Sequence, residues 1–330
     1  MTAPPSRARV QRRPVHGVLL LDKPLGLSSN QALQKAKWLL RAEKAGHTGT
    51  LDPLASGVLP LCFGAATKFS QQQLDADKTY ETIVRLGVNT STADAEGEVL
   101  QQRRVTCTAG QVVQTLDDFT GPIRQVPPMH SALKKDGKAL YEYAREGQSV
   151  EREARAVTIH ELELLDFALT GEGTHPYPYL HLRVQCSKGT YIRTLGEDIG
   201  NALGCGGHLT MLRRVATGGL HVQDAIMLEQ LEALPEDQRL QALHPVETLL
   251  QVWPQITLGH DDAGRFLSGM RRRGPWPDAP QVAVFGDQPR ALLGAAQVKA
   301  GELIPMRLLS PAEIAQMLAQ KVPGGGPDAV

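Results

Sequence analysis

The chain has 330 residues, of which 42% are hydrophobic, and its 35 basic residues balance 35 acidic ones. This size is enough for one large domain and a smaller one, and the neutral charge argues against indiscriminate nucleic-acid binding. No apolar run approaches the roughly 20 residues that span a bilayer, and the Arg-rich start lacks the apolar segment of a secretory signal. The 4 cysteines form no Cys-x-x-Cys pair, which indicates neither disulfides nor a zinc knuckle and predicts a cytoplasmic protein.

The N-terminal stretch is basic. Residues 1–14 are rich in Pro and Arg without periodicity, which predicts a disordered arm. Within residues 1–50 the acids are Asp22 and Glu43 alone. One basic face on a neutral protein is typical of a selective RNA binder, although a solvated basic helix has the same composition.

The first expected elements surround a turn. Residues 17–21 read as a buried strand, residues 22–26 as a turn, and Ser28 or Ser29 as the cap of a helix that ends near Arg41.

Residues 46–60 contain three glycines and two prolines, so we expect a shaped loop here rather than a helix or a central strand. An apolar run over residues 58–63 predicts a strand that anchors the far end of this loop. The loop carries one acid, Asp52, between apolar neighbours. Such a carboxylate either caps its own turn or meets a cation or a set of hydrogen-bond donors.

The middle of the chain alternates strands, turns and helices. The segment over residues 121–147 is basic and turn-rich and includes Tyr141 and Tyr143, a mixture suited to stacking on unpaired RNA bases. The other expected elements are a strand over 79–86, turns over 89–97, a helix from Thr108 to about 119, antiparallel strands over 157–169 and 179–186, a helix from 189 to 203, and a strand over 208–215.

Arg193 falls in the first turn of the helix expected over 189–203, where the helix dipole disfavours a cation. Its presence therefore indicates an anionic partner. Two acids are candidates: Asp52, and Glu197 one helical turn further on.

The last part of the chain differs from the rest. Residues 227–250 look helical and acidic, residues 253–309 predict a small β domain, and residues 321–330 form a Gly- and Pro-rich tail. We expect four parts: an arm over 1–14, a main domain over 15–250, a β domain over 251–312 and a tail over 313–330.

Five segments carry a resemblance to a known family, over about residues 17–217. Gly46-His-Thr-Gly-Thr-Leu-Asp52-Pro-Leu-Ala-Ser-Gly-Val-Leu-Pro60 resembles the nucleophile motif of the TruB family of bacterial tRNA pseudouridine synthases. The match continues through residues 61–69, 78–81, 86–94 and 186–193. The resemblance to the C-terminal PUA-type RNA-binding domain of this family is looser.

The resemblance implies an α+β pseudouridine synthase fold, with a mixed, mainly antiparallel sheet, flanking helices and a PUA-like domain. It implies isomerisation of the uridine at position 55 in the T loop of tRNA, by base flipping and an aspartate nucleophile, without a cofactor. Residues 121–152 resemble a thumb-like segment that closes on the RNA. The partner is the tRNA T arm, and the enzyme is expected to be a monomer without an obligate protein partner.

The resemblance also assigns roles to individual residues. Asp52 is the nucleophile, Arg193 its cationic partner, and Tyr80 the aromatic residue that stacks on uracil, although an aromatic residue packed in the core is equally compatible with its strand. His130 stands where the family has an aromatic residue. The expected substrate-binding residues are His47, Leu212, Lys23, Pro24, Tyr191 and His130.

Two other classes stay open on the residues alone. A glycoside hydrolase also uses an Asp nucleophile, and it pairs this residue with a second carboxylic acid that would have to come from elsewhere in the chain. A non-catalytic RNA-binding protein would use the Asp52 loop as scaffold. An ATP site is not indicated, because the sequence contains no G-x-x-x-x-G-K-[ST], and a metal site at Cys205 and His208 would lack a second pair of ligands.

Overall fold

The structure is a computed structural model that describes residues 11–131 and 133–320. It separates into two compact units. The first comprises Met1–Leu51, Val58–Leu74 and Asp224–Val330, and the second comprises Asp52–Gly57 and Asp75–Gln223. Residues 1–10 of the expected arm and residues 321–330 of the expected tail lie outside the described residues. Within the part that is described, no helix is both long enough and apolar enough to cross a membrane.

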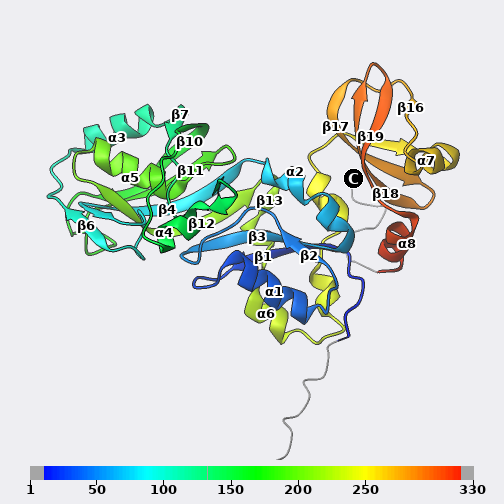
Figure 1. The fold of residues 1–330 in the computed structure, drawn as a ribbon, viewed down its shortest axis with the longest axis horizontal. Coiled ribbons are helices and arrows are strands. Elements are labelled where there is room, and N and C mark those ends of the chain that lie inside the picture. The colour runs from blue at the N-terminus through cyan, green and yellow to red at the C-terminus, as the bar shows by residue number, and fades with distance from the viewer. Residues whose placement is uncertain (1–10, 132, 321–330) are drawn as a thin grey trace, which may run out of the picture. The chain divides into compact units, whose positions relative to one another are not determined.

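The N-terminal part of the first unit combines short strands with helices (Figure 1). Its strand order is β14-β1-β3, with β2 antiparallel to β3 and β14 parallel to β1. Its elements are β1 (Gly17–Lys23), α1 (Ser29–Leu39), β2 (Ala45–His47), β3 (Ala55–Phe63), η1 (Gly64–Lys68), α2 (Ser70–Leu74), β14 (Ile226–Met227), α6 (Leu228–Ala233), η3 (Arg239–Ala242) and η4 (Val246–Leu250).

The glycine- and proline-rich stretch at residues 46–60 is only partly a loop. Its ends belong to strands β2 and β3, and only the residues between His47 and Ala55 lie outside strands. The prediction of a loop throughout was wrong because Gly57 tolerates the positive φ of 106° that strand β3 needs at this point. Pro60 is accommodated as an acceptor, since its carbonyl oxygen receives a hydrogen bond from the Thr48 N–H at 3.0 Å.

Helix α1 fixes the residue that precedes Asp52. Ser28 caps the helix through a capping box with Gln31. The neighbouring Ser29 is buried, and its hydroxyl group donates to the Leu51 carbonyl at 2.9 Å and accepts from the Leu51 N–H at 2.8 Å. Ser28 therefore caps helix α1, and Ser29 holds the start of the Asp52 loop.

The basic and acidic stretches of the first unit meet each other. Lys35 pairs with Glu232 at 2.7 Å, and Arg41 pairs with Glu236 at 2.7 Å. The acidic stretch over residues 227–250 is less helical than expected. It consists of α6 followed by two short 3-10 helices, because Pro235 and Pro245 interrupt it.

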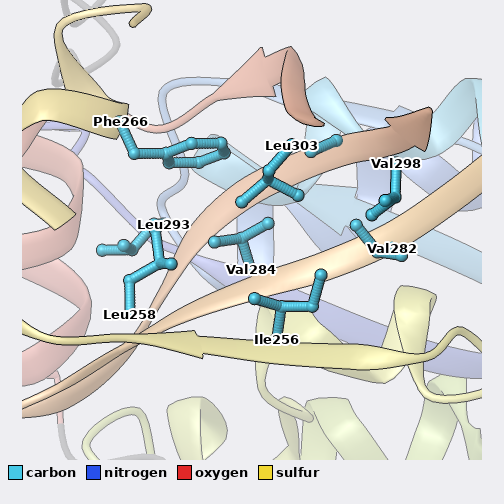
Figure 2. Packing of buried hydrophobic residues seen from close by; sticks show 9 residues of the cluster. Ile256, Leu258, Phe266, Val282, Val284, Leu293, Val298 and Leu303 are labelled. Atoms are coloured by element: carbon cyan, nitrogen blue, oxygen red, sulfur yellow. The ribbon is translucent and has the colours of Figure 1, made fainter. Parts of the chain in front are cut away.

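The small β domain expected near the C-terminus is present as a five-stranded sheet with the order β15-β17-β18-β19-β16. Its core comes from its own strands and from Phe266, as Figure 2 shows. The elements are β15 (Gln255–Leu258), α7 (His260–Leu267), β16 (Arg272–Arg273), β17 (Ala279–Asp287), β18 (Arg290–Lys299) and β19 (Glu302–Leu308).

Helix α8 (Pro311–Ala319) runs across the boundary expected at residue 312. Ser310 and Glu313 form a capping box with Pro311 at the first helical position, a helix start that was not predicted from the sequence. Glu313 also pairs with Lys68 at 2.6 Å.

At the other end of the unit, the Arg13 N–H donates to the Arg41 carbonyl at 2.8 Å, so the described end of the expected arm is tied down.

The second unit contains an antiparallel run of strands in the order β12-β4-β11-β10-β7, drawn in cyan to green in Figure 1. The first residues of β3 pair in parallel with β12, which makes the sheet mixed. Besides the first residues of β3, the unit consists of β4 (Lys78–Leu86), β5 (Val88–Thr90), β6 (Val99–Gln102), α3 (Ala109–Asp118), β7 (Gly121–Gln125), β8 (Lys134–Lys135), β9 (Lys138–Ala139), α4 (Leu140–Arg145), β10 (Arg155–Ala168), β11 (Tyr179–Cys186), α5 (Ile192–Ala202), β12 (Gly207–Thr217), β13 (Leu220–His221) and η2 (Val222–Asp224).

Gly57 lets β3 approach β12 closely. A Cβ atom at Gly57 would lie 2.1 Å from the Arg214 carbonyl oxygen. We expect Gly57→Ala to lower the free energy of unfolding by more than ~3 kcal/mol, since backbone atoms on both strands must move. Gly137→Ala is the matched control, because Gly137 also has a positive φ and its Cβ would meet nothing within 4 Å. That variant should lose only about 1 kcal/mol. Equal losses in chemical denaturation would contradict the steric explanation.

Asp198 on α5 gives the fold a pH dependence. Burial, with the neighbouring Glu197 charge, raises the pKa of Asp198 from 3.8 to about 6. Because the unfolded chain binds this proton only at lower pH, the ionised Asp198 destabilises the fold above pH 6 and ceases to do so near pH 3.8. Asp198→Asn should raise the thermal midpoint at pH 7.5 by about 2–4 °C, and the gain should shrink towards pH 4. The exposed Asp117→Asn should show no such trend.

Candidate active site

Asp52 opens the short segment of the second unit that leads into β3. The Ala55 N–H donates to the Asp52 carbonyl at 3.0 Å, which closes a turn directly before the strand. The Asp52 side chain is not used in this turn bond, and 41% of its surface is exposed. The carboxylate is therefore accessible to a reacting group from solvent.

Arg193 meets the Asp52 carboxylate from the protein side. Its Nη2 lies 3.0 Å from Asp52 Oδ2, although only 7% of the Arg193 side chain is exposed. Arg193 is the first-turn cation of α5, and its anionic partner is Asp52 rather than Glu197, which instead accepts a weak hydrogen bond from Asn89 at 3.4 Å. A buried guanidinium and a half-exposed carboxylate thus form one ion pair.

Arg193 has three further acceptors that fix its orientation. It donates to the carbonyl oxygens of Thr92 at 3.2 Å and His130 at 2.8 Å, and its Nη1 lies 3.3 Å from Asp94 Oδ2. A guanidinium can serve several acceptors at once because its five N–H donors form a rigid planar fork. The position of the positive charge beside Asp52 is therefore determined by the fold.

Asp94 is a residue to which the sequence analysis assigned no role. Its side chain is 4% exposed. Besides Arg193, it accepts hydrogen bonds from the Thr92 hydroxyl group and from the Glu96 N–H at 3.1 Å. An ionised buried carboxylate needs such a donor set. Its place at the end of the quoted 86–94 motif was the available signal.

Tyr80 and Leu212 come from neighbouring strands of the same sheet. Leu212 on β12 lies between Ala55 of β3 and Thr82 of β4, and Tyr80 lies two residues before Thr82. Residues two apart on a strand face the same side, so both side chains share the face on which α5 packs through Gly196 against Val84. Burial raises the pKa of Tyr80, and the negative charge of Asp52 adds to this effect. The phenol is thus neutral at physiological pH.

Tyr191 lies at the N-cap of α5, immediately before Ile192. The buried Gln125 side chain holds its backbone, donating to the Tyr191 carbonyl at 3.3 Å and accepting from its N–H at 3.0 Å. Burial raises the pKa of the Tyr191 phenol. The segment expected to act as a thumb is connected to the site through the backbone of His130, whose carbonyl oxygen accepts a hydrogen bond from Arg193.

Lys23, Pro24 and His47 belong to the first unit. Lys23 is fully buried, and its ammonium group donates to the carbonyl oxygens of Pro24 at 2.8 Å and Leu27 at 2.6 Å, which shapes the turn before α1. His47 lies in β2 opposite Leu61. Their roles towards a substrate stay predictions.

The side chains of Cys205 and His208 each contact a backbone carbonyl group. The Cys205 thiol contacts the Gly206 carbonyl at 3.4 Å, and His208 Nδ1 lies 2.8 Å from the Val88 carbonyl. Among the residues that the structure describes, no group of three potential metal ligands comes together.

Comparison with known proteins places this geometry in a family. Residues 37–192 match the TruB family pseudouridylate synthase (N terminal domain), and residues 193–251 match the tRNA pseudouridylate synthase B C-terminal domain. The chain is 63% identical to the tRNA pseudouridine synthase B of Verminephrobacter eiseniae over 96% of both sequences. It is 58% identical to the protein of the same name from Ralstonia nicotianae, over 93% of this chain and 98% of that protein.

Solved structures show the same fold. A chain in an H/ACA ribonucleoprotein bound to a substrate RNA containing 2'-deoxyuridine superposes with a TM-score of 0.66 at 23% identity, over 90% of this chain and 86% of that one. A chain in a Cbf5-Nop10-Gar1 complex gives 0.67 at 25% identity, over 91% and 86%. The expected pseudouridine synthase fold with a C-terminal β domain is confirmed. The chain belongs to the TruB family of tRNA pseudouridine synthases.

Proposed function

We propose that this protein isomerises uridine 55 in the T loop of tRNA to pseudouridine, with Asp52 as nucleophile. The observation that carries the proposal is the Asp52–Arg193 pair, in which the carboxylate is exposed and its cationic partner is buried. A carboxylate whose charge is stabilised from behind stays ionised and keeps its front open to a substrate. The names of the curated relatives and the family match supply the reaction class.

The reaction breaks the bond between uracil N1 and ribose C1′ and forms a bond between uracil C5 and the same C1′. The proton on C5 is lost and N1 gains one, so the product is an isomer and no external reagent is consumed. Asp52 begins the reaction by attacking either C1′ or uracil C6, and both routes need a carboxylate that forms a covalent bond and leaves again. Arg193 holds this carboxylate and stabilises it again after it leaves.

The remaining residues prepare the nucleotide. The uridine has to leave the base stack to reach Asp52. We assign Tyr80 to stacking on the flipped uracil and Leu212 to packing against it, since they share one face of the sheet. We assign Tyr191 and His130 to the wall of the pocket, and His47, with the turn at Lys23 and Pro24, to the RNA around it.

The second carboxylate at the site, that of Asp94, does not fit the alternative of a glycoside hydrolase. Asp94 contacts Arg193 but is buried and holds three donors, so it cannot deliver a proton to a leaving group. A synthase that rejoins the base has no need for such an acid. We further propose that the enzyme acts in the cytoplasm as a monomer that binds the T arm without a protein partner.

The proposed function is tested with unmodified tRNA transcripts. After incubation, carbodiimide labelling and primer extension should show pseudouridine at position 55 and at no other uridine, and a transcript with cytidine at 55 should remain unmodified. Release of free uracil would indicate hydrolysis instead. Tight binding without any pseudouridine would indicate a non-catalytic RNA-binding protein.

A further inference from the structure

Among the residues that the structure describes, Arg214 on β12 is the largest fully buried side chain by residue volume, with 1% of its surface exposed. Removing a guanidinium from water is costly unless nearby groups accept its hydrogen bonds. The position of Arg214 in the fold suggests a role that explains this burial.

The register of the sheet places Arg214 beside the candidate active site. Arg214 lies directly opposite Tyr80 on β4 and opposite Gly57 on β3, the strand that Asp52 leads into. Directly opposed residues of an antiparallel pair project to the same face of the sheet. Arg214 and Tyr80 thus share the face that also carries Leu212.

The chemistry of the two side chains fixes the direction of their contact. Hydrogen bonding to Arg214 and its positive charge both lower the pKa of Tyr80, against the larger raising effect of burial. The pKa of Lys78 on the same strand is lowered to about 8, first by burial and then by the same positive charge. A guanidinium only donates hydrogen bonds. In a hydrogen bond between these two side chains the Tyr80 oxygen is therefore the acceptor, and its own proton points to a different group.

We propose that Arg214 is a positioning residue, which holds the Tyr80 phenol as an acceptor and so directs the phenol proton towards the reacting nucleotide. In this arrangement Tyr80 is a hydrogen-bond donor to the substrate in addition to its stacking role. The proposal rests on the proposed function, because it assigns the phenol a substrate. The rival explanation is that Arg214 only ties β12 to its neighbours.

A titration tests the contact without relying on activity. Protein labelled with 3-fluorotyrosine gives a fluorine NMR signal for Tyr80, identified by its loss in Tyr80→Phe. Arg214→Gln should shift the titration of this signal to higher pH. Arg213→Gln is the matched control. Arg213 directly precedes Arg214 on β12, lies opposite Glu81 and faces the other side of the sheet, so its replacement should leave the signal unchanged. An unchanged titration in Arg214→Gln overturns the proposal, whether or not the protein makes pseudouridine.

A double-mutant cycle tests the consequence for the reaction. Single-turnover rates at saturating tRNA should fall by about 10-fold or more in Tyr80→Phe and in Arg214→Gln. The double variant should be no more than about threefold slower than Tyr80→Phe, because both changes remove the same interaction. Rates that multiply would show that Arg214 acts independently of Tyr80 and would overturn the proposal. If wild-type protein forms no pseudouridine, the proposed function fails, and the titration still decides whether Arg214 positions Tyr80.

Arg214→Gln has to fold for either experiment, and its thermal midpoint shows whether it does. Should it not fold, Tyr80→Phe carries the test in an otherwise wild-type protein. If the phenol oxygen accepts from Arg214, removing this oxygen leaves the buried Arg214 guanidinium short of an acceptor and lowers the thermal midpoint. Tyr141→Phe, at a half-buried tyrosine of α4, is the control. Equal midpoints for the two tyrosine variants would contradict the proposed contact.

Discussion

Arg193→Lys should slow pseudouridine formation by at least about 100-fold, or ~2.7 kcal/mol of activation free energy, although it keeps the positive charge. The guanidinium of Arg193 reaches Asp52, Asp94 and two carbonyl oxygens at once. An ammonium group is a single point of charge with three donors and cannot span this set. The Asp52 carboxylate would then lose its fixed orientation, and Asp94 would be left buried with too few donors.

The matched control is Arg183→Lys. Arg183 pairs with Glu81 at 2.8 Å and Glu163 at 3.5 Å on an exposed part of the sheet, and such pairs contribute little. Its turnover and thermal midpoint should stay close to wild type. The Arg193→Lys variant should bind tRNA with nearly unchanged affinity, because phosphate contacts dominate binding. Near wild-type turnover in this variant would show that Arg193 is not needed to hold Asp52.

Local sequence signals drew attention to two residues of the proposed site, Asp52 and Arg193. The glycines and prolines around Asp52 marked an unusual backbone, and the position of Arg193 in a first helical turn indicated its anionic partner. Both inferences rest on short-range physics: backbone dihedral preferences in one case and the helix dipole in the other. These signals did not choose between Asp52 and Glu197 as the partner of Arg193, and the structure shows the pair with Asp52, 141 positions away.

Residues whose function depends on long-range contacts were harder to predict. Ser29 looked like a helix cap, and it holds Leu51 instead, a contact that only the folded chain creates. Asp94 looked like a turn residue until the structure placed it on Arg193. For His130 the sequence pointed to its ring, whereas the contact with Arg193 is made by its carbonyl oxygen, and no side-chain pattern reports a backbone contact.

Elements were missed where one signal outweighed another. The glycine and proline content of residues 46–60 concealed the start of β3, because pairing with β12 stabilises a strand that its composition disfavours. The opposite error occurred at the C-terminus. Because the end of the chain is rich in Gly and Pro, the tail was expected to begin at residue 313, which lies inside the capping box that starts α8.

The central claim is that the ionised Asp52 carboxylate is the nucleophile. Asp52→Asn keeps the size of the side chain and much of its hydrogen bonding to Arg193 but removes its charge. We expect no detectable turnover and nearly unchanged tRNA affinity, since the phosphate and stacking contacts remain. Asp75→Asn is a suitable control, because Asp75 pairs with Lys188 at 2.7 Å on the exposed surface of the same unit.

The most direct measurement is single-turnover pseudouridine formation by Asp52→Asn at saturating unmodified tRNA, with the fold verified by the thermal midpoint. We expect wild type and Asp75→Asn to convert position 55 and Asp52→Asn to leave it as uridine. If Asp52 merely capped its turn, asparagine would serve equally well. Conversion by folded Asp52→Asn at a rate within about tenfold of wild type, a difference of ~1.4 kcal/mol in activation free energy, would contradict the account.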